Sequence, residues 1–315
     1  MAADELLPMM KKCFFACCCL AAASVGAAAD DWTLVFEDDF SGSSIDASKW
    51  GKIDYVNYDV AAWRRFQSQD DVLYVSNGET LELWGRYGDY TSQSDQTGEN
   101  PGYACAGICT LNTFSFQYGK VEVRARYDSV LGVWPAIWLL PVKPEKWLTS
   151  GEIDIMEHLN YEGGVRQTLH YPGEDGKDAA SYATINKSFA QLEVAGKDAW
   201  HTYGMEWTAD AITFSVDGID TATFTADGQT YWPFGKEGAE FYLIIDQQIG
   251  GEWVENIGVN KGIDQTTLAN KGALFEVDSV KVYSTENYRH SSLPEPSSAA
   301  LGLLGLVGMA ARRRR

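Results

Sequence analysis

Short segments in which apolar and polar residues alternate recur along this chain, and they limit most strongly what it can fold into. Clear examples are residues 121–127, 211–216 and 275–283. Strict alternation is typical of a β-strand with one buried and one solvent-facing side. Turn pairs such as Asn77-Gly78 separate such segments, and helical signals are few and short. The pattern therefore predicts an all-β domain, built as a sandwich of sheets.

The N-terminus has the features of a secretory signal peptide. Lys11 and Lys12 precede an apolar stretch that ends in small residues suited to cleavage. We expect residues 1–29 to be removed on export, with translation starting at Met9 or Met10. A membrane anchor is the alternative interpretation, but the apolar stretch is short for a transmembrane span.

The C-terminus, residues 289–315, contains a Pro-Glu-Pro motif at 294–296, then an apolar run, then four arginines. This order resembles the PEP-CTERM sorting signal of Gram-negative bacteria, which implies processing by an exosortase-type peptidase. It predicts a protein exported to the cell envelope, the outer surface or the medium. Membrane contact is then expected only through this tail, before processing. An ordinary amphipathic tail is the alternative.

The intervening residues, 30–288, read as one domain, because linker, repeat and low-complexity signals are missing from their sequence. We expect this domain to be a monomer. Of the six cysteines, Cys105 and Cys109 are the two that fall within it. Export permits a disulfide, but on one continuous strand these residues would lie too far apart to be bridged. A bridge across a loop and two buried thiols both remain open.

Charge and composition narrow the class of partner. The formal net charge of the chain is -19, which repels polyanions at long range. Nucleic acids and anionic membrane surfaces are therefore excluded as expected partners, and basic residues are not interleaved with aromatic ones in a nucleic-acid-binding patch. The 11 Trp, 16 Tyr and 13 Phe residues are compatible with a large core or with a surface that stacks on flat ligands.

The acidic segment at residues 152–157 is a candidate for a catalytic site. In a regular strand, Glu152 and Asp154 would share one face, but Glu157 would fall on the core side. A buried, unpaired glutamate is costly. A β-bulge at Ile155-Met156 would insert one extra residue and return Glu157 to the acidic face. We therefore predict three carboxylates along one side of a single strand.

Such a cluster suits glycoside hydrolysis. Two carboxyl groups about 5 Å apart support a retaining mechanism through a covalent glycosyl-enzyme. In this interpretation Glu152 is the nucleophile, Glu157 is the general acid/base, and Asp154 orients the nucleophile. The neighbouring carboxylates would raise the pKa of Glu157, as a general acid requires. An acidic strand facing solvent and a calcium site are the alternatives.

Tryptophans close to this segment favour the glycosidase interpretation. Trp134, Trp138 and Trp147 lie just before it in the chain, and a sugar-binding cleft needs aromatic side chains beside its carboxylates. Trp134 and Trp147 flank proline or loop residues, so we expect them to face a cleft. For Trp138, ordinary core packing is equally compatible with the sequence.

The segment Trp-Pro-Ala-Ile-Trp-Leu-Leu-Pro at 134–141, followed by Ser-Gly-Glu-Ile-Asp-Ile-Met-Glu-His at 150–158, closely resembles glycoside hydrolase family 16 in its β-bulge form. The resemblance extends across the mature domain. It implies a concanavalin A-like β-jelly-roll sandwich of two antiparallel sheets with a concave substrate cleft. It also implies the roles already given to Glu152, Asp154 and Glu157.

The substrate is a finer question, because the family acts on several β-linked polysaccharides. The residues around Trp63 and His158, with segments 167–170 and 245–251, are most similar to mucin-directed endo-β-galactosidases. This resemblance predicts an endo-β-1,4-galactosidase acting on poly-N-acetyllactosamine of mucin-type O-glycans. A laminarinase-like endo-β-1,3-glucanase is the alternative. The expected substrate-binding residues are Trp63, Arg65, Trp134, Trp138, Trp147, His170 and Gln248.

His170 has three open interpretations: contact with the substrate, contact with the acid/base, or a purely structural role. Catalysis is expected to need no cofactor. The resemblance implies a structural calcium on the convex side, bound by Glu37, the backbone of Gly78, and Asp278; ordinary surface carboxylates are the alternative there. Two other functional classes compete with the enzyme: a non-catalytic carbohydrate-binding protein on the same sandwich, and a sorted structural surface protein.

Overall fold

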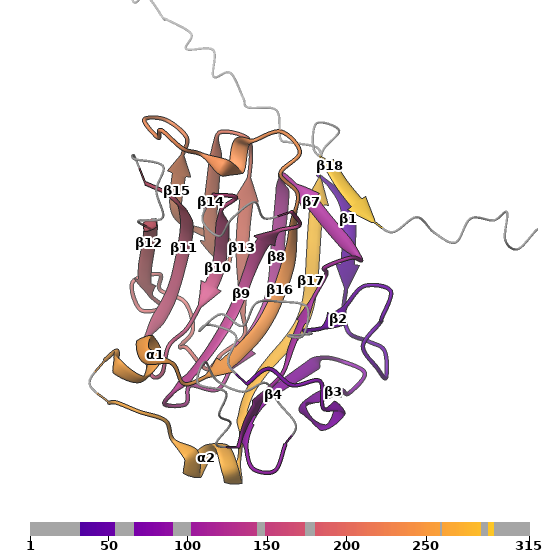
Figure 1. Ribbon diagram of the computed structural model, residues 1–315, viewed down its shortest axis with the longest axis vertical. Helices are drawn as coiled ribbons and strands as arrows, with labels where there is room; N and C mark the ends of the chain where they lie inside the picture. Colours follow the sequence, from indigo (N-terminus) through magenta and orange to yellow (C-terminus); the bar gives the residue numbers. More distant parts are fainter. Residues whose placement is uncertain are drawn as a thin grey trace, which may run out of the picture. The chain divides into compact units, whose positions relative to one another are not determined.

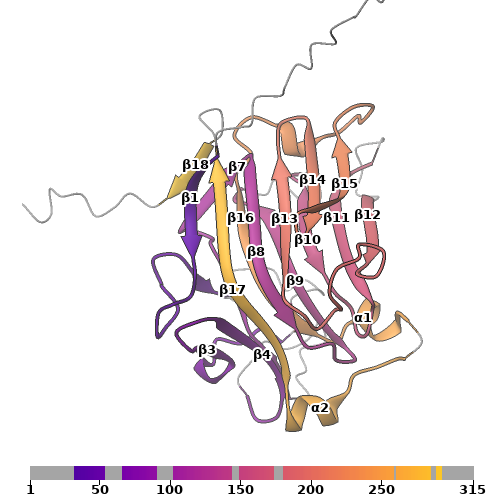
Figure 2. The ribbon, with the colours of Figure 1, turned by 180° about the vertical axis from the view of Figure 1, so that it is seen from behind.

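The computed structural model describes residues 32–53, 66–90, 102–143, 149–173, 180–258, 260–284 and 289–292. They form two nine-stranded sheets. All pairings between the described strands are antiparallel. Views from the two sides show a different sheet in front each time (Figures 1 and 2). The predicted all-β sandwich is therefore confirmed.

The first sheet, called sheet A here, has the order β15-β14-β13-β8-β17-β4-β3, with β1 added on β17 and β5 on β4. Its strands are β1 (Thr33–Asp38), β3 (Tyr74–Ser76), β4 (Leu81–Tyr87), β5 (Tyr103–Cys105), β8 (Gly119–Tyr127), β13 (His201–Trp207), β14 (Ala211–Val216), β15 (Ile219–Thr225) and β17 (Ala273–Ser284).

The second sheet, sheet B, has the order β12-β11-β10-β9-β16-β6-β2, with β7 on β16 and β18 on β7. Its strands are β2 (Gly51–Lys52), β6 (Gly107–Cys109), β7 (Phe114–Gln117), β9 (Val133–Pro141), β10 (Glu152–Glu157), β11 (Gly164–Pro172), β12 (Ala180–Ser188), β16 (Phe241–Ile249) and β18 (Arg289–Ser292). Two short helices, α1 (Glu252–Asn256) and α2 (Gln265–Asn270), and the 3-10 turns Asp71–Leu73 and Pro233–Gly235 complete the described elements.

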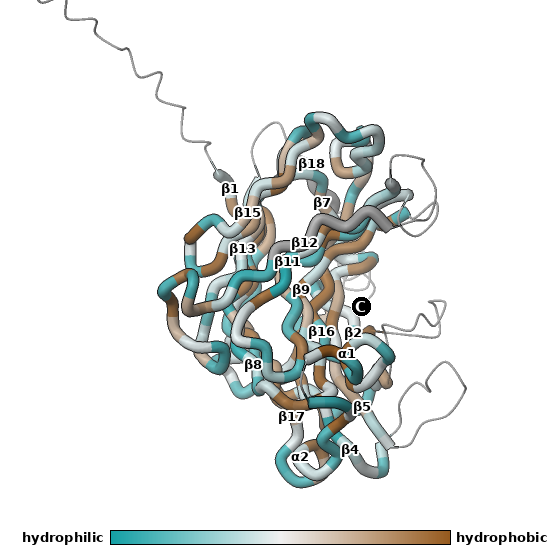
Figure 3. Tube along the Cα trace, turned by 90° about the vertical axis from the view of Figure 1, so that its left-hand side faces the viewer, coloured by the Kyte–Doolittle hydropathy of each residue, from teal (hydrophilic) through white to brown (hydrophobic). Residues whose placement is uncertain are grey.

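The main core lies between the sheets and draws on both. Val121, Val123 and Ala125 of β8 meet Ile153 and Leu243 of sheet B in one buried cluster. The alternation predicted for residues 121–127 is present, because the intervening residues of β8 are partly or fully exposed. Figure 3 shows hydrophilic and hydrophobic residues distributed along the same strands. Burial of the apolar side of each strand therefore explains why the alternating segments form two stacked layers.

The two cysteines of the domain lie on different sheets. Cys105 ends β5, which pairs with β4, whereas Cys109 ends β6, which pairs with β16. Both are buried thiols rather than partners in a disulfide. The chain passes from one sheet to the other between them, so they belong to neither a common strand nor a common loop.

The predictions for the ends of the chain were the domain boundary at residue 288, the signal peptide and the sorting tail. Strand β18, residues 289–292, pairs with β7, so sheet B takes in four residues that the sequence analysis counted with the tail. The predicted signal peptide and the remainder of the predicted sorting tail lie outside the described residues and stay predictions. Among the described helices, none is long and apolar enough to cross a membrane.

Candidate active site

Strand β10 contains the predicted bulge. Asp154 pairs with Trp138 of β9, and the register then shifts before Met156 pairs with Ile137. Ile155 and Met156 are both part of the buried core. This extra residue restores the alternation for Glu157, which returns to the face that carries Glu152 and Asp154. The bulge prediction is therefore confirmed.

The three carboxylates of β10 face a pocket with walls made by three adjacent strands of sheet B. Strand β9 supplies Trp134, Ala136 and Trp138, and β16 supplies Asp246 and Gln248. The pocket thus brings together six of the side chains predicted from sequence: Glu152, Asp154, Glu157, Trp134, Trp138 and Gln248. Trp63, Arg65 and Trp147, also predicted to bind substrate, lie outside the described residues.

Glu157 has the properties of a proton donor. Its side chain is 6% exposed, and this burial raises the pKa of Glu157 well above its ordinary value. The negative charge of Asp154 raises the pKa further, while the positive charge of His170 partly opposes the shift. Thr168 donates a hydrogen bond to Glu157 over 3.4 Å. The raised pKa favours the protonated form of Glu157, which is the form that a general acid needs.

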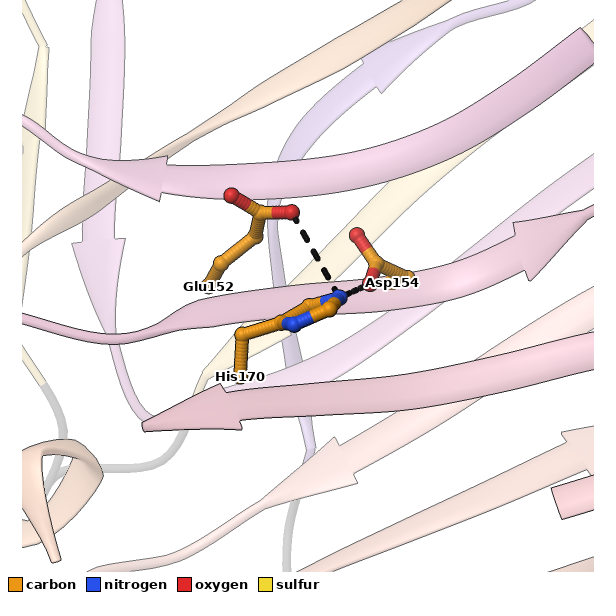
Figure 4. Close-up of side chains that lie close together, drawn as sticks. All are labelled: Glu152, Asp154 and His170. Atoms are coloured by element: carbon orange, nitrogen blue, oxygen red, sulfur yellow. Dashed lines mark ion pairs between the residues drawn. The ribbon is translucent and has the colours of Figure 1, made fainter. Parts of the chain in front are cut away.

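His170 lies beside the other two carboxylates. It sits on β11 directly opposite Glu152, and its Nε2 atom is 3.1 Å from Oδ2 of Asp154 and 3.8 Å from Oε1 of Glu152. Figure 4 shows the three side chains pointing toward one another from neighbouring strands. The two ion pairs thus connect His170 to the nucleophile candidate and its neighbour.

These contacts favour a charged imidazole. Burial alone would lower the pKa of His170, but the contact with Asp154 and the charges of Asp154, Glu152 and Glu157 outweigh it and raise the pKa to about 9. At neutral pH the imidazolium holds Asp154 in place and attracts the Glu152 carboxylate.

Carboxylate and imidazole groups can also bind a metal ion. In the described part of the chain, Glu152, Asp154 and His170 are the one group of three acidic, histidine or cysteine side chains with ligand atoms within 4.8 Å of one another. A protonated histidine has no lone pair for a metal, so the group fits an ion-paired triad at neutral pH better than a metal centre.

The predicted calcium residues lie on sheet A and its turn. Glu37 pairs with Lys281 at 3.4 Å, and Asp278 pairs with Arg124 at 2.9 Å. Gly78 sits between β3 and β4 with φ +90. Carboxylate and carbonyl oxygens suit calcium, but both carboxylates already have a cationic partner, and the site stays a prediction.

Besides Oδ2 of Asp154, which forms the ion pair with His170, two pocket residues present buried polar atoms that lack a hydrogen-bond partner among the described residues. They are Nε1 of Trp134 and both amide atoms of Gln248, and the two residues pair directly across β9 and β16. Buried polar groups are normally satisfied, because leaving them unpaired costs free energy. A ligand with both donors and acceptors, such as a sugar with its hydroxyl groups, would satisfy them.

Sequence reasoning missed Asp246 and Gln67. The Trp138 indole donates to Oδ1 of Asp246 over 2.8 Å, and the Gln67 amide donates to Oδ2 over 3.0 Å. The sequence signal for Asp246 was an aspartate that directly follows the apolar run Phe241–Ile245, two residues from Gln248 and therefore on the same face. Gln247 lies on the opposite face and donates to carbonyls of sheet A.

Loops at one end of the pocket are tied together by Asn160. Its side chain accepts from the backbone of Gly132 and donates to the carbonyl of Val254 in α1. Helix α1 thereby places Trp253 against Trp134, with ring centroids 4.8 Å apart. The contact fixes the orientation of Trp134 at the pocket wall.

A two-sheet sandwich with a bulged acidic strand, a buried glutamate of raised pKa and aromatic walls is the arrangement of a glycoside hydrolase. Residues 61–258 match the sequence profile of "Glycosyl hydrolases family 16". The chain belongs to this family.

Individual relatives carry different activities. The keratan-sulfate endo-1,4-beta-galactosidase of Sphingobacterium multivorum is 28% identical over 263 residues, which are 81% of this chain and 56% of that protein. The chain therefore spans about half the length of that relative. Among solved structures, one from work on endo-acting O-glycanases with which human gut bacteria initiate mucin breakdown aligns with a TM-score of 0.66 and 26% identity, covering 81% of this chain and 91% of its own.

A laminarinase is equally similar in structure. The catalytic domain of an endo-1,3-beta-glucanase from Thermotoga petrophila RKU-1 aligns with a TM-score of 0.67 and 26% identity, covering 82% of this chain and 100% of its own. The fold and the family are therefore shared by relatives that act on different glycans.

Proposed function

We propose that this protein is a retaining endo-β-glycosidase that cleaves internal linkages of a glycan. The observation that carries the proposal is the contrast between two glutamates in one pocket. Burial raises the pKa of Glu157 and favours its protonated form, whereas Glu152 lies near the His170 imidazolium. Such a division between an acid and an anion is what two-step glycoside hydrolysis requires.

In the first step, the Glu157 carboxyl group donates its proton to the glycosidic oxygen while the Glu152 carboxylate attacks the anomeric carbon. The bond to the leaving sugar breaks, and a glycosyl-Glu152 ester forms. In the second step, Glu157, now ionised, removes a proton from water, which attacks the same carbon and releases Glu152. Asp154, held by His170, keeps the nucleophile oriented. Proton NMR of the first-formed product tests the mechanism, because an inverted anomer would contradict it.

We further propose poly-N-acetyllactosamine of mucin-type O-glycans as the substrate, cut at β-1,4-galactosyl bonds. The similarity to a keratan-sulfate endo-β-galactosidase and to a structure from work on mucin O-glycanases supports this choice. The buried amide of Gln248 and the indole N–H of Trp134 supply a donor and acceptor set that suits hydroxyl and N-acetyl groups.

The test compares initial rates on desialylated mucin glycans, keratan-type chains, laminarin and lichenan, with products identified by mass spectrometry. We expect the lactosamine chains to be cleaved fastest. A preference for laminarin would instead support the endo-β-1,3-glucanase function that the laminarinase structure suggests. Binding without cleavage of any of the four would support a non-catalytic carbohydrate-binding protein.

Export and calcium binding are separate proposals. N-terminal sequencing of protein recovered from the medium or cell envelope is expected to begin at Asp30, and mass spectrometry to find the C-terminal apolar run and arginines removed. Recovery of the intact chain in the cytoplasm would contradict export. For calcium at Glu37, Gly78 and Asp278, chelation is expected to lower the melting temperature, and readdition of Ca²⁺ to restore it.

A further inference from the structure

A buried glutamine interrupts the apolar side of strand β11. Val165, Gln167 and Leu169 alternate along this strand with side chains on the core side, and all three are 0% exposed. Valine and leucine are ordinary core residues. An amide side chain, in contrast, costs free energy in an apolar core unless its polar atoms are hydrogen-bonded. The contacts of Gln167 therefore show what this side chain does.

Gln167 lies against the bulge of β10. The register of the two strands shifts between Asp154 and Glu157. The two residues in between, Ile155 and Met156, therefore face a single residue of β11, which is Gln167. Its side-chain amide donates to the carbonyl of Ile155 over 3.0 Å. A bulge disrupts the backbone ladder around its extra residue, and here a side chain supplies a donor at that point.

The same amide group reaches a second bulge, on sheet A. Its nitrogen donates to the carbonyl of Ser215 in β14 over 3.4 Å, and its oxygen accepts from the hydroxyl group of Thr221 in β15. That hydroxyl also reaches the carbonyl of Phe214 over 3.0 Å. The register of β14 and β15 shifts between Phe214 and Ser215, which leaves Thr221 as the extra residue. One side chain thus connects a bulge in each sheet through the core.

These contacts specify one orientation for the Gln167 amide, because its N–H groups meet carbonyl oxygens and its oxygen meets a hydroxyl group. A buried polar link with satisfied partners is rigid and specific for one arrangement of the core. The bulge of β10 is what returns Glu157 to the pocket face that carries Glu152. A contact that holds the bulge therefore also holds the proton donor in place relative to the nucleophile.

We propose that Gln167 is a positioning residue for catalysis, which holds the Ile155 carbonyl in the bulge and so keeps the Glu157 carboxyl group within reach of the glycosidic oxygen. The inference rests on the proposed glycosidase function, which it deepens. Gln167 itself is buried on the core side of the sheet and acts only through the backbone of β10. A displacement of about 1 Å in a reacting group can lower a rate by about 100-fold.

The first experiment uses Gln167→Met, which removes the amide and keeps a flexible side chain that can fill the same space. The rate of glycosyl-enzyme formation is measured with a natural glycan, which needs the proton of Glu157, and with an aryl glycoside that has an acidic phenol, which needs it little. We expect the glycan rate to fall roughly 10- to 100-fold and the aryl glycoside rate to change by less than about threefold. A general loss of structure would lower both rates equally.

The matched control is Gln247→Met. Gln247 is also a buried glutamine of sheet B, and its amide also donates to carbonyls of sheet A, those of Leu83 and Ala273, over 2.8 and 3.0 Å. It lies on β16, however, which does not pair with β10. We expect this variant to lose stability as Gln167→Met does, but to keep the wild-type ratio of the two rates.

A second pair of variants tests the connection from sheet A. Thr221→Val keeps the shape of the side chain and removes the hydroxyl group that donates to Gln167. The glycan rate should fall by about 3- to 10-fold, the range expected when one hydrogen bond of a positioning chain is lost. Thr221→Ser retains the hydroxyl group and should recover most of that loss.

Equal losses with the two substrates in Gln167→Met, the same change of ratio in Gln247→Met, or wild-type rates in a folded Gln167→Met protein would overturn the proposal. Misfolding of both Gln167→Met and Thr221→Val, while Gln247→Met folds, would assign Gln167 a purely structural role. If the wild-type protein cleaves neither substrate, the proposed glycosidase function fails. Amide hydrogen exchange then still decides whether Gln167 holds the bulge: exchange at residues 155–157 should be faster in Gln167→Met than in Gln247→Met, and equal exchange would contradict this.

Discussion

Strands β8 and β16 belong to different sheets and differ in the exposure of the face that points away from the core. In β8, core residues alternate with half-exposed ones such as Glu122 and Arg124. In β16, all nine residues are buried, although Asp246 and Gln248 point away from the core. The outer face of sheet A meets water, where charges cost little. The pocket face of sheet B keeps charges out of water, and burial there raises the pKa of Glu157 well above its ordinary value.

From this comparison we expect that loss of one carboxylate on the pocket face lowers the hydrolysis rate far more than loss of one on sheet A. Glu152→Gln should reduce hydrolysis by at least about 1,000-fold, because the glycosyl-enzyme cannot form without the nucleophile. The fold should survive, since glutamine has the same shape. Initial rates and circular dichroism check both points. The matched sheet A variant, Glu122→Gln on β8, should keep wild-type activity; activity of Glu152→Gln within tenfold of wild type would remove Glu152 from the mechanism.

The variant Glu157→Gln tests whether Glu157 is the general acid and not the nucleophile. Cleavage of a natural glycan should fall by roughly 100- to 10,000-fold, because the leaving oxygen is no longer protonated. An aryl glycoside with an acidic phenol needs little protonation to depart, so its glycosylation step should be nearly unaffected. Burst kinetics with the two substrates measure this difference. Equal losses on both would argue that Glu157 is not the acid.

His170 links the pocket to pH-dependent stability. Its folded-state pKa of about 9 lies above the ordinary value of 6.5. Its stabilising contribution is therefore fully present below about pH 6.5 and is lost as the pH rises through 9. The shift corresponds to roughly 3 kcal/mol of unfolding free energy. Replacing His170 by Gln should lower the melting temperature at pH 6 and flatten its decline between pH 6.5 and 9. A variant with the same slope as wild type would exclude His170 as the source.

The smallest effect is expected on sheet A. Glu37 and Lys281 form an exposed pair at 3.4 Å, and such pairs contribute about 0–1 kcal/mol. Glu37→Gln should therefore change the melting temperature little in the presence of a chelator. If Glu37 also binds calcium, the same variant should lose the stabilisation that added Ca²⁺ gives the wild type. Titration of both proteins with Ca²⁺ separates these two roles.

The strand pattern and the bulge could be predicted because they depend on neighbours in the chain. Alternation in residues 121–127 and 275–283 located β8 and β17, and the cost of burying an unpaired Glu157 required an extra residue in β10. The short helices α1 and α2 escaped prediction, since five or six residues carry little periodic signal. The open question about Trp138 was resolved by an interaction no local pattern contains, its bond to Asp246.

The sequence by itself determined the class of fold and the side of β10 that carries Glu152, Asp154 and Glu157, and it suggested the chemistry that we propose for those three side chains. These properties follow from alternation along a strand and from local steric and electrostatic costs. Only the tertiary structure decided which distant residues share the pocket. Gln67 meets Asp246 across 179 positions of sequence, and His170 reaches Asp154 only because β11 lies beside β10. Burial raised the pKa of Glu157, and the neighbouring carboxylates raised that of His170; these surroundings exist only in the folded chain.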